Sequence, residues 1–362
     1  MTRKRIADFQ ARMKAKGIDA AMIKTASSFT YFADVMWLRP GLVIPAEGEP
    51  VAFIATNEVE AFLERSCIRN VVPYHGIDEL MPGVTRVIRE GGFHKVGMDM
   101  SVERDAFELF GNMFTKMNPK AEIVDVHALI MELRMVKDAS EIERIRHAAR
   151  VTDRGMEAAM KRVEPGASEL DVAADAVYAM MKDGSERPHV YVNAGPVARI
   201  HAEPRASARI GAGDVVTVVI GGDSENYYCN ETRTYVPASA SAEKKRAFEV
   251  LRSVYQTITP KLRPGTVLES VEEEIGTALT AGGYADHYVK GCAHGVGLLV
   301  EEDPITTILI PHRRMALRAG MVIAAMHAPL AIPGAGSFKI EDTYLIGPGG
   351  PEQLTQHPTA VP

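Results

Sequence analysis

Two histidines and one glutamate in the second half of the chain have the residue types needed for proton transfer. His201 follows a glycine–proline turn, His294 is flanked by an alanine and a glycine, and Glu341 ends a strand-like segment. An imidazole takes up and releases protons near neutral pH, because its unperturbed pKa is about 6.5. An imidazole can thus act as a general acid and base. His294 and Glu341 are predicted catalytic partners that hold the substrate or activate water.

The segments around these residues follow the order and spacing of a known family. They are residues 213–221, 227–234, 293–298, 320–322 and 339–343. In this order they resemble the creatinase, prolidase and methionine aminopeptidase family, whose catalytic domain has the pita-bread fold. The place of His201 in this family pattern implies that it acts as the general acid and base. The members of that family that use metal bind two ions through two Asp, one His and two Glu residues.

The resemblance implies that most ligands of such an ion pair are missing. Val219 and Asn230 stand where the two Asp residues are expected, and Met326 stands where the first Glu is expected. Only His294 and Glu341 remain. Valine offers no lone pair, a neutral amide binds weakly, and a thioether is a soft donor in a site for hard cations. The sequence therefore predicts no bound metal and no other cofactor.

On this basis the chain is predicted to be a creatinase-like hydrolase that is independent of metal. It would cleave a C–N bond of the amidine or amide type in a small polar metabolite. One alternative is a mononuclear-metal hydrolase related to peptidases, or a lyase of a small osmolyte. If the strand near Met326 is shifted by one residue, His294, His327 and Glu341 could hold that single ion. Another alternative is a catalytically inactive pita-bread protein that only binds a partner.

Further residues are predicted to contact the substrate. In creatinase-like dimers the amino-terminal domain of one subunit reaches the pocket of the other with an aromatic residue and an Arg, so the resemblance implies a homodimer. The predicted substrate contacts are Asn230, Glu231, His327, Trp37, Arg39 and Arg313. Glu231 would need a local bulge to face the pocket, since neighbouring strand residues point to opposite faces. Glu301 occupies the place of a second family histidine.

The elements that must position these residues are predicted to form two domains of an α/β (α+β) protein. Residues 1–134 alternate helix and strand patterns and resemble the amino-terminal domain of creatinases and prolidases. Residues 135–362 are predicted to form the pita-bread catalytic domain, a curved antiparallel sheet covered by helices. Ser140, with Glu143 three residues later, predicts a helix start. Pro-Gly pairs at residues 165–166 and 264–265, each before a helix pattern, form a weak internal echo.

The composition describes an ordinary globular chain of 362 residues with a net charge of −6. The acidic balance argues against a nucleic-acid surface, and the absence of a long apolar run argues against a membrane span or a signal segment. Three cysteines in so long a chain do not form a disulfide framework. The sequence therefore predicts a cytoplasmic protein that acts on a small-molecule substrate.

Overall fold

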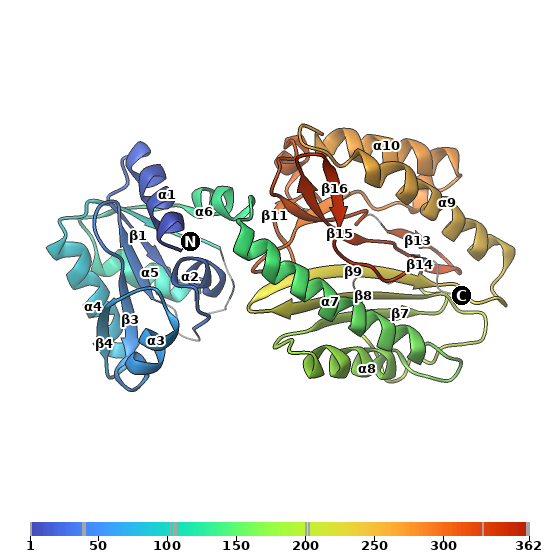
Figure 1. The fold of residues 1–362 in the computed structure, drawn as a ribbon, viewed down its shortest axis with the longest axis horizontal. Helices are drawn as coiled ribbons and strands as arrows, with labels where there is room; N and C mark the ends of the chain where they lie inside the picture. Colours follow the sequence, from blue (N-terminus) through green and yellow to red (C-terminus); the bar gives the residue numbers. More distant parts are fainter. Residues whose placement is uncertain are drawn as a thin grey trace. The chain divides into compact units, whose positions relative to one another are not determined.

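A computed structural model describes residues 2–37, 41–101, 103, 107–199, 201, 203–327 and 329–359. The chain divides into two compact units, Met1–Arg134 and Met135–Pro362 (Figure 1). Each unit has its own sheets and its own apolar core. The predicted fold class, a mixed α/β unit followed by antiparallel sheets covered by helices, is confirmed. None of the described helices is long and apolar enough to cross a membrane.

The first unit is built on a six-stranded sheet with strand order β4-β3-β2-β1-β5-β6. The strands are β1 (Ala20–Ile23), β2 (Leu42–Pro45), β3 (Val51–Ala55), β4 (Asn70–Tyr74), β5 (Lys95–Met98) and β6 (Glu122–Asp125). The helices are α1 (Thr2–Ala15), α2 (Ala26–Ala33), α3 (Val59–Arg65), α4 (Ile77–Glu90), α5 (Phe107–Met117) and α6 (His127–Arg134). All four residues of β1 are buried. An apolar run without alternation is typical of a strand that is covered on both faces.

The second unit contains a three-stranded sheet, a five-stranded sheet and a two-stranded sheet. The three-stranded sheet is β7 (His189–Ala194), β8 (Val216–Ser224) and β9 (Tyr227–Tyr235). The five-stranded sheet is β11 (Glu302–Ile305), β10 (Ala293–Gly295), β12 (Val322–Ala325), β15 (Asp342–Gly347) and β16 (Gly350–Gln353). The two-stranded sheet is β13 (Leu330–Ile332) and β14 (Gly336–Phe338). All the paired strands of this unit run antiparallel.

Two pairs of helices cover these sheets separately. Figure 1 shows α7 (Ala139–Arg162) and α8 (Glu169–Lys182) against the β7–β9 sheet. Their apolar residues share one core with β7 and β8. The other pair is α9 (Ala242–Ile258) and α10 (Leu268–Ala281), which share a second core with β10, β12 and β15. Each helix pair therefore stabilises the strands that lie next to it in the chain.

The internal echo of the sequence has a structural counterpart before α8 and α10. Gly166 and Gly265 both have a φ of +92°, a conformation that glycine adopts without the steric cost of a Cβ. The backbone N–H of Gly166 donates to the carbonyl of Ile210 at 2.8 Å, and that of Gly265 donates to the carbonyl of Leu317 at 2.8 Å. The same turn therefore starts the second helix of each pair.

The start of α7 differs from the prediction. The N-cap is Asp138, two residues before Ser140, and its Oδ1 accepts hydrogen bonds from the backbone N–H groups of Ser140 and Glu141. Glu141 completes a capping box by accepting from the N–H of Asp138 at 2.9 Å. A carboxylate at this position satisfies two free N–H groups and also interacts favourably with the helix dipole. Ser140 therefore lies inside the first turn.

Candidate active site

A cavity of about 260 Å³ lies in the second unit and brings together four of the ionisable residues singled out above, His201, His294, Glu301 and His327. It is lined by His189, Tyr191, His201, Val219, Asn230, His294, Val300, Glu301, His327 and Lys339. These residues come from β7, β8, β9 and β10 and from the segments that follow β7, β10 and β12 or precede β15. Residues far apart in the sequence thus meet at one place.

Strand β9 presents Asn230 and Thr232 to this site and turns Glu231 away from it. Strands β8 and β9 pair in unbroken register along their whole length, so alternation decides the direction of each side chain. Glu231 is buried on the opposite face, where its Oε2 lies 3.2 Å from Nη2 of Arg233. Burial raises the pKa of Glu231 well above its usual value in spite of this arginine. The substrate contact predicted for Glu231 is therefore not supported by its position.

Glu341 is completely buried, and protein donors already occupy both of its oxygens. Oε2 accepts from Asn230 Nδ2 at 2.8 Å, from Thr232 Oγ1 at 2.9 Å and from Lys339 Nζ at 2.9 Å. Oε1 lies 2.6 Å from Nδ1 of His327. Burial by itself would raise the pKa of Glu341, but Lys339 and the neighbouring histidines hold it well below the usual value. Glu341 is therefore an ionised carboxylate that orients its neighbours.

His327, and not Met326, faces the cavity. Met326 has a φ of +67°, and its side chain lies in the apolar core. This local turn of the backbone directs the next side chain into the site, whereas β12 itself keeps an unbroken register up to Ala325 and shows no one-residue shift. A carboxylate can only accept, so the 2.6 Å contact with Glu341 places the proton of His327 on Nδ1. Burial, followed by the charge of Lys339, lowers the pKa of His327. Its Nε2 is left as a lone pair.

His294 is fixed in the same tautomer by a different partner. Its Nδ1 lies 2.9 Å from the carbonyl oxygen of Gly295, which accepts the proton and leaves Nε2 as a lone pair. The Nε2 atoms of His294 and His327 each lie 3.9 Å from Oε1 of Glu301. The donor atoms of these three residues all lie within 4.8 Å of one another. Two imidazoles and one carboxylate therefore converge on one point.

This donor set fits one divalent cation and not two. Two histidine nitrogens and a carboxylate oxygen are ligands that zinc or iron accept. A second ion would need further anionic oxygens, but Val219 and Asn230 supply none and both oxygens of Glu341 are hydrogen-bonded. In the three-ligand set considered from the sequence, Glu301 thus takes the place of Glu341. Glu341 stands behind His327, as carboxylates often do behind metal-binding histidines.

Lys339 is a site residue that the sequence analysis did not single out. Its side chain is 2% exposed, and its Nζ lies 3.0 Å from Nδ1 of His327 and 3.3 Å from Nε2 of His201. The available signal was its spacing from Glu341, since residues two apart in an extended segment share a face. A lysine next to a predicted catalytic carboxylate could have been included on that ground.

His201 lies at the rim of the cavity in a left-handed backbone conformation with a φ of +50°. Much of the residue is exposed, but its ring is 4.9 Å from the ring of His327 and 5.8 Å from that of Tyr191. Partial burial, followed by the positive charge of Lys339, lowers the pKa of His201. The imidazole is therefore neutral at neutral pH and is placed beside the other ionisable groups.

Two predicted substrate contacts, Trp37 and Arg313, are not among the described residues that line this cavity. Trp37 belongs to the first unit, where its Nε1 donates to Glu58 at 3.0 Å and its ring packs edge-on against Phe62. Arg313 lies in a short 3-10 helix, and its Nε donates to the carbonyl of Thr306 at 2.7 Å. Arg39 lies outside the described residues.

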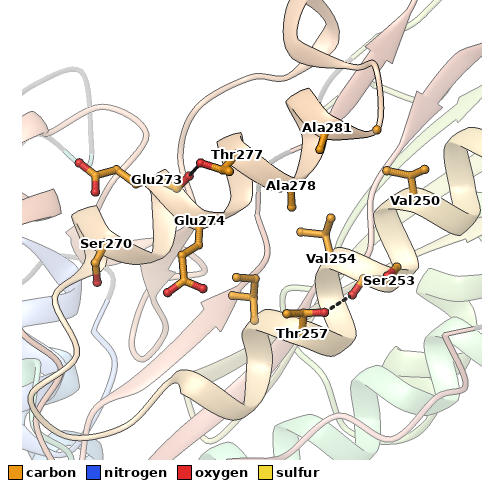
Figure 2. A pocket seen from close by; sticks show the side chains of 12 residues that line it. Val250, Ser253, Val254, Thr257, Ser270, Glu273, Glu274, Thr277, Ala278 and Ala281 are labelled. Carbon is orange, nitrogen blue, oxygen red and sulfur yellow. Dashed lines mark hydrogen bonds between the residues drawn. The ribbon is translucent and has the colours of Figure 1, made fainter.

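A larger groove of about 750 Å³ between α9 and α10 lacks this chemistry. Figure 2 shows its apolar floor and the hydrogen bonds that Thr257 and Thr277 make. Each hydroxyl donates at 2.8 Å to a backbone carbonyl of its own helix. The ionisable lining residues, Glu273 and Glu274, lie on α10. The smaller cavity is therefore the candidate active site.

Comparisons with known proteins identify the family of the chain. Residues 143–348 match the model of metallopeptidase family M24, and residues 5–136 match that of the creatinase/prolidase N-terminal domain. A Xaa-Pro dipeptidase of Pyrococcus furiosus is 26% identical over 95% of this chain and 95% of its own length. The crystal structure of a prolidase from Pyrococcus horikoshii superposes with a TM-score of 0.88 at 25% identity, covering 98% of this chain and 99% of that one. A Xaa-Pro dipeptidase structure from Bacillus anthracis gives a TM-score of 0.89 at 21% identity over 99% of both chains.

These relatives overturn the predicted activity. The chain was expected to be a metal-independent, creatinase-like hydrolase of non-peptide C–N bonds, but similar proteins along nearly its whole length are named as dipeptidases. The prediction was wrong because it preferred the loss of ligands at the expected positions to the alternative of a single ion held by other residues. It gave too little weight to Glu301 and His327, which restore a compact donor set.

Proposed function

Because this chain belongs to metallopeptidase family M24, we propose that it hydrolyses the peptide bond of a small peptide. The cavity lined by His201, His294 and His327 is the proposed active site. Its volume of about 260 Å³ is below the range of about 300–1,000 Å³ that is usual for drug-sized ligands. A dipeptide is therefore the proposed substrate, in agreement with the names of the relatives.

The observation that carries this proposal is the convergence of His294, Glu301 and His327. We propose that they hold one divalent cation. Such an ion polarises a carbonyl oxygen and makes water more acidic, which is the chemistry that peptide hydrolysis requires. The two imidazoles are prepared for this role, since each has its proton on Nδ1 and a free lone pair on Nε2.

The other residues of the site have distinct parts in the proposed reaction. Glu341 and the carbonyl of Gly295 orient the two histidines, which fixes their tautomers before a ligand binds. His201 stands at the rim, where its neutral imidazole can hydrogen-bond the peptide and exchange a proton with it. Asn230 and Val219 form part of the wall, so they contribute shape and one amide to the bound peptide.

The test joins metal content to peptidase activity. The full chain, purified without an affinity tag that binds metal, is analysed by plasma mass spectrometry and then assayed on a panel of dipeptides with and without a C-terminal proline. We expect about one ion per chain, loss of hydrolysis after chelation and its recovery when Zn²⁺, Mn²⁺ or Co²⁺ is added. A protein that binds its ion but cleaves none of the dipeptides would contradict the proposed function.

The predicted homodimer and the cytoplasmic location stay predictions. A dimer would allow Trp37 or Arg39 of one subunit to approach the cavity of the other, as the resemblance to creatinase implies. Analytical ultracentrifugation of the full chain measures the first of these directly.

A further inference from the structure

Lys339 is a buried cation at the centre of the proposed active site. It lies between β14 and β15, and its side chain is 2% exposed although it lines the cavity. Its Nζ is 2.9 Å from Glu341 Oε2, 3.0 Å from His327 Nδ1 and 3.3 Å from His201 Nε2. Few lysines are buried this completely, and those that are need a paired carboxylate.

The three ammonium protons of Lys339 can be assigned from these contacts. One proton goes to Glu341 Oε2, and a second goes to the lone pair of His201 Nε2. His327 cannot accept the third proton, because its Nδ1 already donates to Glu341. Among the described residues no further acceptor is found within hydrogen-bond distance. One N–H of the ammonium is therefore available to a ligand in the cavity.

The ammonium also supplies a positive charge beside Glu341, a carboxylate that binds no ion in the proposed one-ion site. The resemblance implies two ions in the metal-dependent relatives, but here the donor set fits one. Glu341 stands where the family has one ligand of the ion pair, and here its Oε2 is instead surrounded by Asn230, Thr232 and Lys339. The positive charge next to this carboxylate is thus supplied by the protein itself.

We propose that Lys339 is the second cation of this centre and donates its remaining N–H to the substrate oxygen on which negative charge develops. This role rests on the proposed function. A fixed hydrogen-bond donor aimed at a developing negative charge is an effective way to stabilise a transition state, because the donor needs no reorganisation during the reaction.

The proposal predicts that loss of the Lys339 charge strengthens ion binding but slows the reaction. A positive charge close to His327 repels a divalent ion held on the other nitrogen of that ring, and this repulsion is weakly screened in a buried site. Removing the charge in Lys339→Met should therefore tighten ion binding by about tenfold or more. The same change should lower kcat by about 100-fold or more, since it removes a donor to the transition state.

The experiment is a calorimetric titration of the metal-stripped full chain with Zn²⁺, followed by steady-state kinetics on the best dipeptide. Lys339→Arg keeps the charge, so its ion affinity should stay near that of the wild type and part of kcat should return. Lys161→Met, at a lysine whose side chain is 73% exposed on α7, is the matched control and should change neither quantity.

Lys339→Met leaves Glu341 without its cation and could prevent folding. A second comparison avoids this difficulty. It sets the single variant Glu341→Gln against the double variant Glu341→Gln/Lys339→Met, so that the ammonium is removed from a protein that no longer has the carboxylate charge. The ion should again bind more tightly to the variant that lacks Lys339.

Weaker ion binding without Lys339, or an unchanged kcat in Lys339→Met, would overturn the proposal. If the wild-type chain binds an ion but hydrolyses no peptide, the proposed function fails while the titration still decides whether Lys339 acts as a second cation. The two ideas are therefore tested separately.

Discussion

Thr232, within β9, and Glu341, the residue before β15, form an isolated antiparallel bridge. The N–H of Thr232 donates to the carbonyl of Glu341 at 3.0 Å, and the N–H of Glu341 donates to the carbonyl of Thr232 at 3.2 Å. The Thr232 hydroxyl also donates to the Glu341 carboxylate at 2.9 Å. Three bonds between one pair of residues tie two sheets together at the active site and fix the direction of the carboxylate.

Glu341→Gln should weaken ion binding although Glu341 is not a proposed ligand. The amide oxygen can still accept from His327, but it lacks the charge that makes this imidazole a stronger donor to metal. Loss of such an outer carboxylate typically costs about 10–100-fold in metal affinity. Calorimetric titration of the folded variant measures the change. An affinity equal to that of the wild type would show that Glu341 does not act through His327.

Glu301→Gln should remove most of the bound ion while leaving the metal-free protein folded. The Glu301 side chain is 35% exposed at the cavity, so its charge contributes little to the stability of the metal-free chain. Metal content after gel filtration and the melting temperature without metal are the two measurements. Glu164→Gln, at an exposed glutamate before α8, is the control. Full metal content in Glu301→Gln would favour Glu341 as the third ligand instead.

His201→Ala should reduce kcat by about 100-fold or more, the usual contribution of a general acid or base. Its melting temperature should stay close to that of the wild type, because much of the residue is exposed. His75→Ala, an exposed histidine of the first unit, should alter neither quantity. A large fall in the melting temperature of His201→Ala would instead identify a structural histidine.

Asp99→Asn should destabilise the first unit at neutral pH but not in acid. Burial opposes ionisation of Asp99, but hydrogen bonds from His127, Ser28 and Thr25 outweigh it and lower the pKa of this carboxyl below 3.8. A depressed folded-state pKa means that the stabilisation is fully present above the unfolded value and is lost as the pH falls through the folded value.

Thermal or urea unfolding at a series of pH values tests this prediction for Asp99. At pH 7 the cost of Asp99→Asn should be about 1–3 kcal/mol, as for a buried hydrogen-bonded charge. The difference in the free energy of unfolding between the variant and the wild type should become smaller below about pH 3.8. Glu90→Gln, at an exposed residue at the end of α4, supplies the control. A difference in unfolding free energy that stays constant from pH 7 to pH 3 would rule out the lowered pKa of Asp99.

The fold and the order of the motifs could be predicted because they depend on patterns that the sequence states directly. The order and spacing of the motifs carry the resemblance to the creatinase and prolidase family, which implied the fold; the helix and strand patterns and the weak Pro-Gly repeat agree with it. Simple alternation along β9 also gave the right direction for Asn230 and Glu231, and the bulge that would have reversed it is absent from this fully described strand. Helix α7 begins two residues before the predicted start, since Asp138 is the stronger N-cap.

The donor set itself could not be read reliably from the sequence. Whether Met326 or His327 faces the cavity depends on a φ of +67° at Met326. Methionine rarely adopts this conformation, and no local sequence pattern predicts it here. Glu301 comes from the segment after β10, so its approach to His294 depends on the tertiary path of the chain. A comparison made position by position misses ligands that come from other sequence positions but reach the same site in the folded chain.

The second unit has two halves, each with a Pro-Gly turn, at Gly166 and at Gly265, and the two halves contribute different residues to the site. The later half supplies all three proposed ion ligands and also Lys339, whereas the earlier half supplies Tyr191, His201 and the β8–β9 wall. Substitutions at lining residues of the earlier half such as Tyr191 and Val219 can therefore change which peptides fit the cavity while the three proposed ion ligands and Lys339 stay unchanged. Selectivity could then change through mutation of one half while the proposed ion site in the other half is kept.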